Sequence, residues 1–174
     1  MVQREYVFKV VILGDGGVGK TSLVLQYTEN QFTGNYIMTI GSNFAVKILH
    51  RPEENMKIKL QLWDLAGQLH FKFIRPPFYQ GALLSVLVFD LTSRESFENI
   101  GLWQSETLKN VGEIPFLLIG NKKDLQSERV VSKSEGEELA KEIGALGYFE
   151  TSAKTGENLD EMMDQCVDII IERM

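Results

Sequence analysis

The sequence predicts an α/β fold in which a mostly parallel, doubly wound sheet carries helices on both faces. Short apolar runs end at a glycine or another turn residue, as buried parallel strands do. Segments with the period of amphipathic helices lie between and after these runs along the chain. At 174 residues, the chain has the size of one domain with a real core, so we predict a single domain over 1–174.

Six strands are expected, one of them antiparallel. Residues 7–13, 83–89 and 116–119 are apolar throughout, which is typical of buried parallel strands. Residues 44–48 and 58–62 instead alternate apolar and polar side chains on either side of a turn, which predicts a half-exposed hairpin. This hairpin would add the antiparallel strand.

Two features predict the last two helices. Four apolar residues step by four, three and four positions and so share one helix face: Leu159, Met163, Cys166 and Ile170. Cys166 is then a core residue, because a reactive thiol needs exposure and a lowered pKa. In the helix before, the Ser-x-x-Glu spacing of Ser134 and Glu137 predicts a capping box.

The composition excludes several classes of protein. With 18 Lys+Arg against 24 Asp+Glu, the net charge of −6 argues against a nucleic-acid binder. The single cysteine excludes an internal disulfide and a multi-thiolate zinc site. The longest apolar run falls short of the ~18 residues of a membrane helix, and the N-terminus lacks a secretory signal. We therefore expect a cytoplasmic protein.

A phosphate-binding loop is predicted at Gly14–Thr21, whose sequence GDGGVGKT matches G-x-x-x-x-G-K-[ST]. The loop directly follows the first predicted strand and precedes a helix that begins near Lys20. In such a loop, backbone N–H groups and the helix dipole face the phosphates. Lys20 would reach the β and γ phosphates, and Thr21 would bind Mg²⁺. The alternative, a glycine-rich turn without a ligand, does not account for this placement.

Asp64 is the predicted carboxylate ligand of the metal. It follows the predicted strand at 57–62, at the sheet edge where ligands collect in such folds. An isolated Asp at a strand end is more often only a turn former. The phosphate loop upstream favours the metal role.

The segments 121–124 and 151–154 follow two further predicted strands and indicate which base is bound. A carboxylate at Asp124 can accept from both N1–H and the 2-amino group of guanine. Adenine lacks these donors and would leave a buried Asp124 unpaired, at a cost of ~1–3 kcal/mol or more. We therefore predict a guanine nucleotide and poor binding of adenine nucleotides.

Taken together, these motifs resemble those of the Ras-like small GTPases along the whole chain, and of the Rab branch most closely. The segments that carry the resemblance are 14–21, 39–41, 63–68, 121–124 and 152–154. The resemblance implies a P-loop NTPase domain that binds GTP or GDP with Mg²⁺ and slowly hydrolyses GTP to GDP and phosphate. It also implies a monomeric molecular switch whose γ-phosphate orders two segments, the first switch, which carries Thr39, and the second switch, which follows Gly67.

By position, the resemblance also implies the contacts with the nucleotide. Phe32 packs on the guanine, Lys122 and Lys154 line the base pocket, and Ala153 offers its N–H to the guanine carbonyl. The remaining nucleotide-binding residues implied are Asp15, Gly16, Gly17, Val18, Gly19, Lys20, Thr21, Ser22, Thr39, Gly67, Asn121, Asp124 and Ser152.

For hydrolysis, the resemblance implies that Thr39 joins Thr21 and Asp64 around Mg²⁺, that Gly67 contacts the γ-phosphate and that Gln68 orients the attacking water. Lys20, Mg²⁺ and loop N–H groups would neutralise charge, while Gln68 and the Thr39 carbonyl would place the water. No Lys or Arg lies between residues 28 and 39, so the first switch has no arginine to act in cis. We expect slow turnover, on the order of 10⁻⁴ to 10⁻³ s⁻¹, accelerated by the arginine of an activating protein.

Two other functions remain open from the residues alone. One is a nucleotide-bound interaction module that never turns over, because Leu65, Leu69 and the pair Pro76-Pro77 crowd the catalytic switch. The other is an adenine-nucleotide kinase or ATPase on the same phosphate loop, which would leave the 121–124 motif without a purpose.

The resemblance implies protein partners: effectors, an exchange factor and a GTPase-activating protein, in vesicle or membrane trafficking. Phe44, Trp63 and Phe78 occupy the positions of an effector-facing aromatic triad, unless they only pack against the sheet. Leu69, Phe71, Phe73 and Phe78 make the second switch apolar, which favours a partner site over internal packing. Membrane association is expected only through a lipidated tail beyond residue 174.

Near Gln68, the sequence departs from the family pattern. Pro76 and Pro77 are expected to stop the helix of the second switch near Ile74. Arg75 is the nearest arginine of this segment, and the prolines put its reach to the phosphates in doubt. His50 and His70 lack metal-ligand spacing and are expected at the surface, with water positioning by His70 as a minor alternative.

Overall fold

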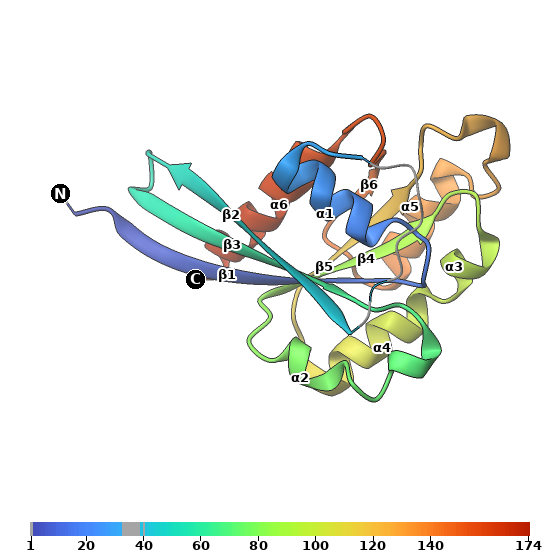
Figure 1. Ribbon diagram of the computed structural model, residues 1–174, viewed down its shortest axis with the longest axis horizontal. Coiled ribbons are helices and arrows are strands. Elements are labelled where there is room, and N and C mark those ends of the chain that lie inside the picture. The colour runs from blue at the N-terminus through green and yellow to red at the C-terminus, as the bar shows by residue number, and fades with distance from the viewer. Residues whose placement is uncertain (1, 33–38, 40) are drawn as a thin grey trace.

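The structure, a computed structural model, describes residues 2–32, 39 and 41–174 (Figure 1). Over these residues, six strands form one sheet in the order β2-β3-β1-β4-β5-β6. All neighbouring pairs are parallel except β2 and β3, which form the predicted hairpin. The predicted α/β fold with one antiparallel strand is confirmed.

The element bounds follow the predicted order. The strands are β1 Arg4–Leu13, β2 Ser42–Arg51, β3 Met56–Leu65, β4 Leu84–Asp90, β5 Phe116–Asn121 and β6 Tyr148–Glu150. The helices are α1 Lys20–Glu29, α2 Pro76–Tyr79, α3 Arg94–Glu98, α4 Ile100–Val111, α5 Lys133–Glu142 and α6 Leu159–Glu172. Single 3₁₀ turns lie at Leu69–Phe71 and Gln126–Glu128.

Each face of the sheet has its own core, because side chains alternate along a strand. In β1, Val10 and Ile12 join a core with α1 and α6, while Val11 and Leu13 join one with α2, α4 and α5. Figure 1 shows α1 and α6 on one side of the sheet and α2 and α4 on the other. Helices therefore cover both faces, as predicted.

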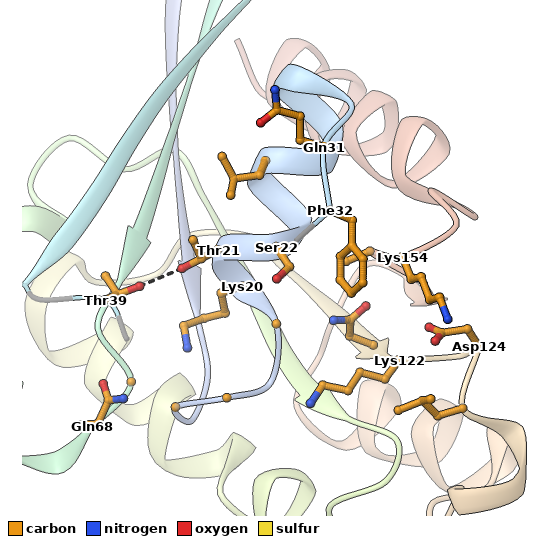
Figure 2. A pocket seen from close by; sticks show the side chains of 18 residues that line it. Lys20, Thr21, Ser22, Gln31, Phe32, Thr39, Gln68, Lys122, Asp124 and Lys154 are labelled. Atoms are coloured by element: carbon orange, nitrogen blue, oxygen red, sulfur yellow. Dashed lines mark hydrogen bonds between the residues drawn. The ribbon is translucent and has the colours of Figure 1, made fainter. Parts of the chain in front are cut away.

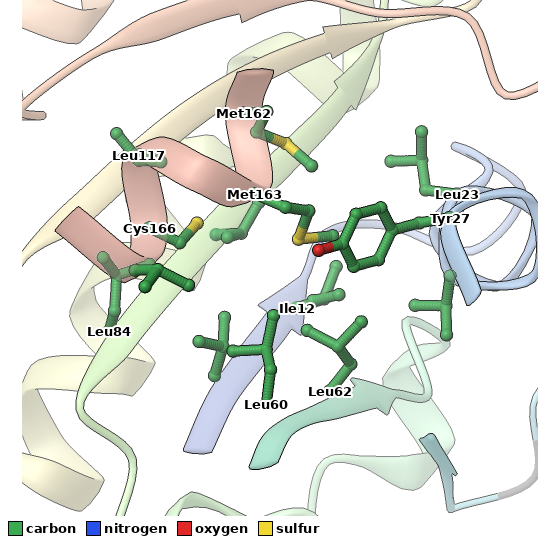
Figure 3. Packing of buried hydrophobic residues seen from close by; sticks show 14 of the residues in the cluster. Ile12, Leu23, Tyr27, Leu60, Leu62, Leu84, Leu117, Met162, Met163 and Cys166 are labelled. Atoms are coloured by element: carbon green, nitrogen blue, oxygen red, sulfur yellow. The ribbon is translucent and has the colours of Figure 1, made fainter. Parts of the chain in front are cut away.

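The predicted face of α6 is confirmed. Its four apolar residues are all buried, and Figure 3 shows Met162, Met163 and Cys166 directed toward Tyr27 of α1 and the strands. Burial raises the pKa of the Cys166 thiol above its usual range. Cys166 is thus an inert core residue.

The capping box of α5 lies two residues before the predicted one. Ser132 Oγ accepts from the Glu135 N–H at 3.1 Å, and Glu135 Oε2 accepts from the Ser132 N–H at 2.8 Å. The prediction of Ser134 and Glu137 is wrong because Arg94 also binds Glu135, at 2.8 Å, and so holds the earlier glutamate in the capping position.

The helical turns that follow Gln68 end by Ile74, as expected, but a new helix that was not expected follows them. The two prolines begin α2 at Pro76, after the 3₁₀ turn at Leu69–Phe71. Proline is tolerated in the first turn of a helix, because the N–H groups there have no partner within the helix. Within the described part of the chain, no helix has the length and apolar character needed to cross a bilayer.

Candidate functional site

A cavity of about 490 Å³ opens at the carboxyl end of β1, beside the N-terminus of α1 (Figure 2). It brings together most of the residues predicted to bind nucleotide: Gly16, Gly17, Gly19, Lys20, Thr21, Ser22, Phe32, Thr39, Gly67, Gln68, Asn121, Lys122, Asp124, Ala153 and Lys154. Asp15, Val18, Asp64 and Ser152 are absent from this lining. The last three contact lining residues directly, whereas the Asp15 side chain contacts residues outside the cavity. Leu25, Gln31 and Leu125 also line the cavity and were missed. The only signal was position, since Leu25 lies one turn after Thr21 and Leu125 follows Asp124.

The phosphate loop packs too closely for side chains at two of its contacts. Gly19 has a φ of 99° and ends the loop, and a Cβ there would lie 2.3 Å from Asn121 Nδ2. A Cβ on Gly67 would lie 2.4 Å from the Gly14 carbonyl oxygen. Glycine is therefore required where the loop meets β5 and where the second switch meets the loop.

Lys20 lies across the inside of the phosphate loop. Its Nζ donates to the carbonyl oxygens of Gly14 and Asp15, both at 2.8 Å, and its side chain is buried. Burial lowers the pKa of Lys20 to about 8, against the opposing charges of Asp64 and Asp15. The Lys20 ammonium group is thereby held beside the place where the loop N–H groups would donate to phosphate oxygens.

Three oxygen-bearing side chains meet beside Lys20. Thr21 Oγ1 lies 2.7 Å from Thr39 Oγ1, and both hydroxyls donate to Asp64 Oδ2, Thr39 at 3.3 Å. Asp64 Oδ1 is buried and has no hydrogen-bond partner among the described residues. Burial raises the pKa of Asp64, and Lys20 opposes that rise. Hydroxyl and carboxylate oxygens are the ligands that Mg²⁺ prefers, so these residues fit that ion.

Asn121 ties the phosphate loop to the base end of the cavity. Its Nδ2 donates to the Val18 carbonyl at 2.9 Å, and its Oδ1 accepts from Thr151 Oγ1 at 3.0 Å. The side chain is buried. It holds the phosphate loop, which lies 103 residues earlier in the sequence, next to the segment at Thr151, which lies 30 residues later.

Asp124 projects from the loop after β5 into the other end of the cavity. Ser152 Oγ donates to Asp124 Oδ1 at 2.7 Å. The predicted discrimination against adenine assumed that the Asp124 carboxylate is buried. That assumption is wrong for the protein without nucleotide, in which Asp124 is exposed on its loop. Discrimination against adenine therefore depends on the base itself covering Asp124.

The other predicted base contacts surround Asp124. Lys122 pairs with Asp90, Nζ to Oδ2 at 2.9 Å, and its chain lines the cavity. Figure 2 shows Phe32, Lys122 and Lys154 around the same end of the cavity. Ala153 is buried beside them. The flat face of an aromatic base would fit between Phe32 and the Lys122 stem.

Asp15 has a different role from the rest of the phosphate loop. Its carboxylate accepts from Asn99 Nδ2 at 2.8 Å and from Trp103 Nε1 at 2.9 Å. The side chain is therefore committed to α4 and its N-cap. It holds the loop in place from outside the cavity.

Arg75 is buried rather than directed at the phosphates. Its Nη1 donates to the carbonyls of Ala66 and Gln68, at 2.9 and 3.1 Å, and the guanidinium pairs with Glu106. His70 is exposed and lies against Phe71, with ring centroids 4.1 Å apart, away from the cavity lining. Gln68 lies on the cavity wall, across from Lys20 in Figure 2.

The aromatic triad forms one continuous surface. The ring centroids of Phe44 and Trp63 are 4.7 Å apart, and those of Trp63 and Phe78 are 6.0 Å apart. Phe44 is half exposed, whereas Leu69 and Phe73 are 80% and 89% exposed. Internal packing therefore does not account for Leu69 or Phe73.

The family model for the Ras family matches residues 9–172, which is nearly the whole chain and includes every part of the cavity described above. The chain belongs to the Ras family. As a member of this family of small GTPases, it hydrolyses GTP to GDP and phosphate. Within the Ras family it is of the Rab type.

Three relatives illustrate this similarity. Ras-related protein Rab-13 of Bos taurus is 41% identical over 170 residues, covering 97% of this chain and 82% of the relative. Ras-related protein Rab-3A of Homo sapiens is 38% identical over 172 residues, covering 98% and 76%. Ras-related protein Rab-2B of Dictyostelium discoideum is 39% identical over 171 residues, covering 98% and 83%.

Proposed function

We propose that this Ras-family protein is a GTP-dependent switch whose cavity holds the nucleotide from the metal to the base across the ends of β3, β1, β5 and β6. The observation that carries the proposal is the convergence of Thr21, Thr39 and Asp64 beside the buried Lys20. A buried carboxylate oxygen without a partner needs a cation or a donor to balance it. Bound Mg²⁺, held by Thr21, Thr39 and Asp64, would supply that cation and would neutralise phosphate charge.

The phosphate loop has two tasks in this proposal. Lys20 would move its donors from the carbonyls of Gly14 and Asp15 to phosphate oxygens, and the N–H groups of residues 15–22 would bind the same oxygens. No covalent step involves the protein, because phosphoryl transfer needs mainly positioning and charge neutralisation. Gln68 and the Thr39 carbonyl would place the attacking water.

The base end would provide selectivity. Asp124, oriented by Ser152, would accept the two guanine donors, and the N–H of Ala153 would donate to the guanine carbonyl. Phe32, Lys122 and Lys154 would enclose the ring. Removal of a charged hydrogen-bond partner of this kind weakens binding by roughly 1.5–3 kcal/mol.

The output of the switch would be protein binding. Contacts of the γ-phosphate with Thr39 and Gly67 would order both switches, and hydrolysis would release them. The surface formed by Phe44, Trp63, Phe78, Leu69 and Phe73 would then distinguish the two states for effectors and regulators. An exchange factor, an activating protein that supplies an arginine, and a role in vesicle or membrane trafficking complete the proposal.

The test is a single-turnover measurement. Protein loaded with GTP and Mg²⁺ is followed by chromatography for hours, beside a Gln68→Leu variant. We expect slow conversion to GDP, on the order of 10⁻⁴ to 10⁻³ s⁻¹, and its near loss in the variant. Hydrolysis by Gln68→Leu at the unmodified rate would disprove the role of Gln68, and a rate above about 10⁻² s⁻¹ would disprove the need for a partner's arginine.

A further inference from the structure

A buried polar cluster joins the second switch to α4. Arg75 is 4% exposed, and its guanidinium pairs with Glu106 of α4, Nη2 to Oε1 at 3.0 Å and Nε to Oε1 at 3.0 Å. The Tyr79 hydroxyl donates to the other oxygen of Glu106 at 2.9 Å. The carboxylate is thus fixed from two sides, and Arg75 is fixed by the carboxylate.

The free end of the same guanidinium binds the backbone on both sides of Gly67. Arg75 Nη1 donates to the Ala66 carbonyl at 2.9 Å and to the Gln68 carbonyl at 3.1 Å. The two carbonyls lie on either side of Gly67, the residue proposed to contact the γ-phosphate. One of them is the carbonyl of Gln68, the residue proposed to orient the attacking water. The conformation of the Gly67–Gln68 backbone therefore depends on a contact from Arg75.

Helix α4 also holds the phosphate loop. Trp103 donates to Asp15 Oδ1 at 2.9 Å, and the Arg75 guanidinium lies over the Trp103 ring, 4.6 Å from its centroid. One helix therefore contacts both the loop that would bind the phosphates and the arginine that holds Gln68. Rigid elements with fixed contacts position catalytic groups more precisely than a free loop does.

We propose that Arg75, anchored by Glu106, is a positioning residue that sets the place of Gln68 relative to the phosphate loop. The proposal rests on the role of Gln68 under the proposed function. Arginine suits the task because its planar group presents five donors and here reaches a carboxylate and two carbonyls at once. A lysine ammonium at the same place could not span all three.

The first measurement compares hydrolysis of preloaded GTP with Mg²⁺ in the unmodified protein and in Arg75→Met. Misplacing a catalytic group costs on the order of 10-fold or more in rate. We expect Arg75→Met to slow hydrolysis by about that factor, and no more than Gln68→Leu does. GDP dissociation should change by less than about 2-fold, because GDP release does not use Gln68. Hydrolysis at the unmodified rate would overturn the proposal.

A double-mutant cycle separates positioning from a general structural role. In the Gln68→Leu background, Arg75→Met should have no further effect, because Arg75 would act only through Gln68. An equal loss in both backgrounds would overturn the proposal. If Gln68→Leu itself hydrolyses normally, the assigned role of Gln68 has failed and the proposal falls with it. If only Arg75→Met is normal, the proposal alone has failed.

Two further variants keep the test decisive if Arg75→Met folds poorly. Arg75→Met combined with Glu106→Gln removes both buried charges, so no unpaired carboxylate remains. The glutamine oxygen can still accept the hydrogen bond from the Tyr79 hydroxyl. This double variant should hydrolyse GTP as slowly as Arg75→Met, and a normal rate would overturn the proposal. Arg75→Lys keeps the charge without the bridge and should also be slow, whereas full rescue would show that charge alone matters.

Arg129→Met is the matched control. Arg129 is another largely buried arginine, which pairs with Glu150 and donates to the Val131 carbonyl at 2.7 Å. Glu150 belongs to β6, the edge strand at the opposite end of the sheet from β2 and β3. Loss of Arg129 should lower the melting temperature and leave the rate of GTP hydrolysis in the loaded protein unchanged. An equal fall in rate in this variant would show that destabilisation, rather than positioning, slows the chemistry.

Discussion

At the scale of single residues, burial decides what the charged groups of the site can do. Lys20 and Asp64 are both buried, and burial favours the neutral form of each. It lowers the pKa of Lys20 and raises the pKa of Asp64. Each also supports the charge of the other. The site is therefore strained electrostatically without a ligand, and phosphate with Mg²⁺ would restore both full charges.

This gives a pH-dependent prediction for Lys20. Its pKa is about 8 in the nucleotide-free protein and would return upward when phosphate binds. The Lys20 contribution to binding of GDP should then be a larger proton uptake at pH 8.5, above this pKa, than at pH 7, below it. Calorimetry in buffers of different ionisation enthalpy measures this uptake. Equal uptake at both pH values would contradict the assignment, and Lys20→Met should show none.

The same shift has a defined sign for folding. The pKa of Lys20 is lower in the folded chain than the usual lysine value of 10.5, so the unfolded chain binds the extra proton between pH 8 and 10.5. The destabilisation by Lys20 is complete below pH 8. It is relieved as the pH rises through that window.

At the scale of elements, tertiary contacts choose between local signals of equal strength. Two Ser-x-x-Glu sequences overlap before α5, and only the one whose glutamate also binds Arg94 forms the cap. Pro76 and Pro77 likewise begin a helix rather than end one. Local chemistry allowed both outcomes in each case.

The two serines provide a matched pair of variants. Ser132→Ala removes the side chain that accepts from the Glu135 N–H and should lower the free energy of unfolding by about 1 kcal/mol. Ser134→Ala lies inside the helix and should change it by less than about 0.5 kcal/mol. Denaturant titration of both variants measures the difference. A larger loss for Ser134→Ala would place the cap where the sequence alone suggested it.

At the scale of the whole molecule, the strand order arranges the site. Asp64 ends β3, the phosphate loop follows β1, and the base segments follow β5 and β6. A nucleotide would therefore lie across the sheet edge with its metal at β3 and its base at β5 and β6. Thr39 of the first switch and Gly67 of the second lie at the metal end, where a γ-phosphate would contact both.

Hydrogen exchange should detect that control. Protein loaded with a non-hydrolysable GTP analogue should exchange backbone amides of residues 39–41 and 66–75 more slowly than protein loaded with GDP. Residues 148–154 contact only the base end and should exchange equally in both states. Protection that is the same throughout the chain would argue against a switch. Mass spectrometry of peptides from these segments resolves the two cases.

Much of the fold and site could be predicted because the signals were local. Each motif follows a strand that the residue pattern itself predicts. This holds for the phosphate loop, for Asp64 and for the base segments. The contacts of Asp15 and Arg75 could not be predicted, since their partners Trp103 and Glu106 are distant in sequence and carry no motif. The exposure of Asp124 also escaped prediction, because a loop's openness depends on the packing around it.

The burial of Cys166 makes the protein suitable for labelling at an introduced cysteine, because the native thiol should not react. It is the only cysteine in the sequence, it is fully buried, and its thiol has a raised pKa, so thiol-directed dyes should leave the folded chain unlabelled. A cysteine introduced at the exposed Phe73 would then take a single fluorophore in the second switch. The nucleotide cycle could be followed in real time from that one reporter, with the native thiol left in place.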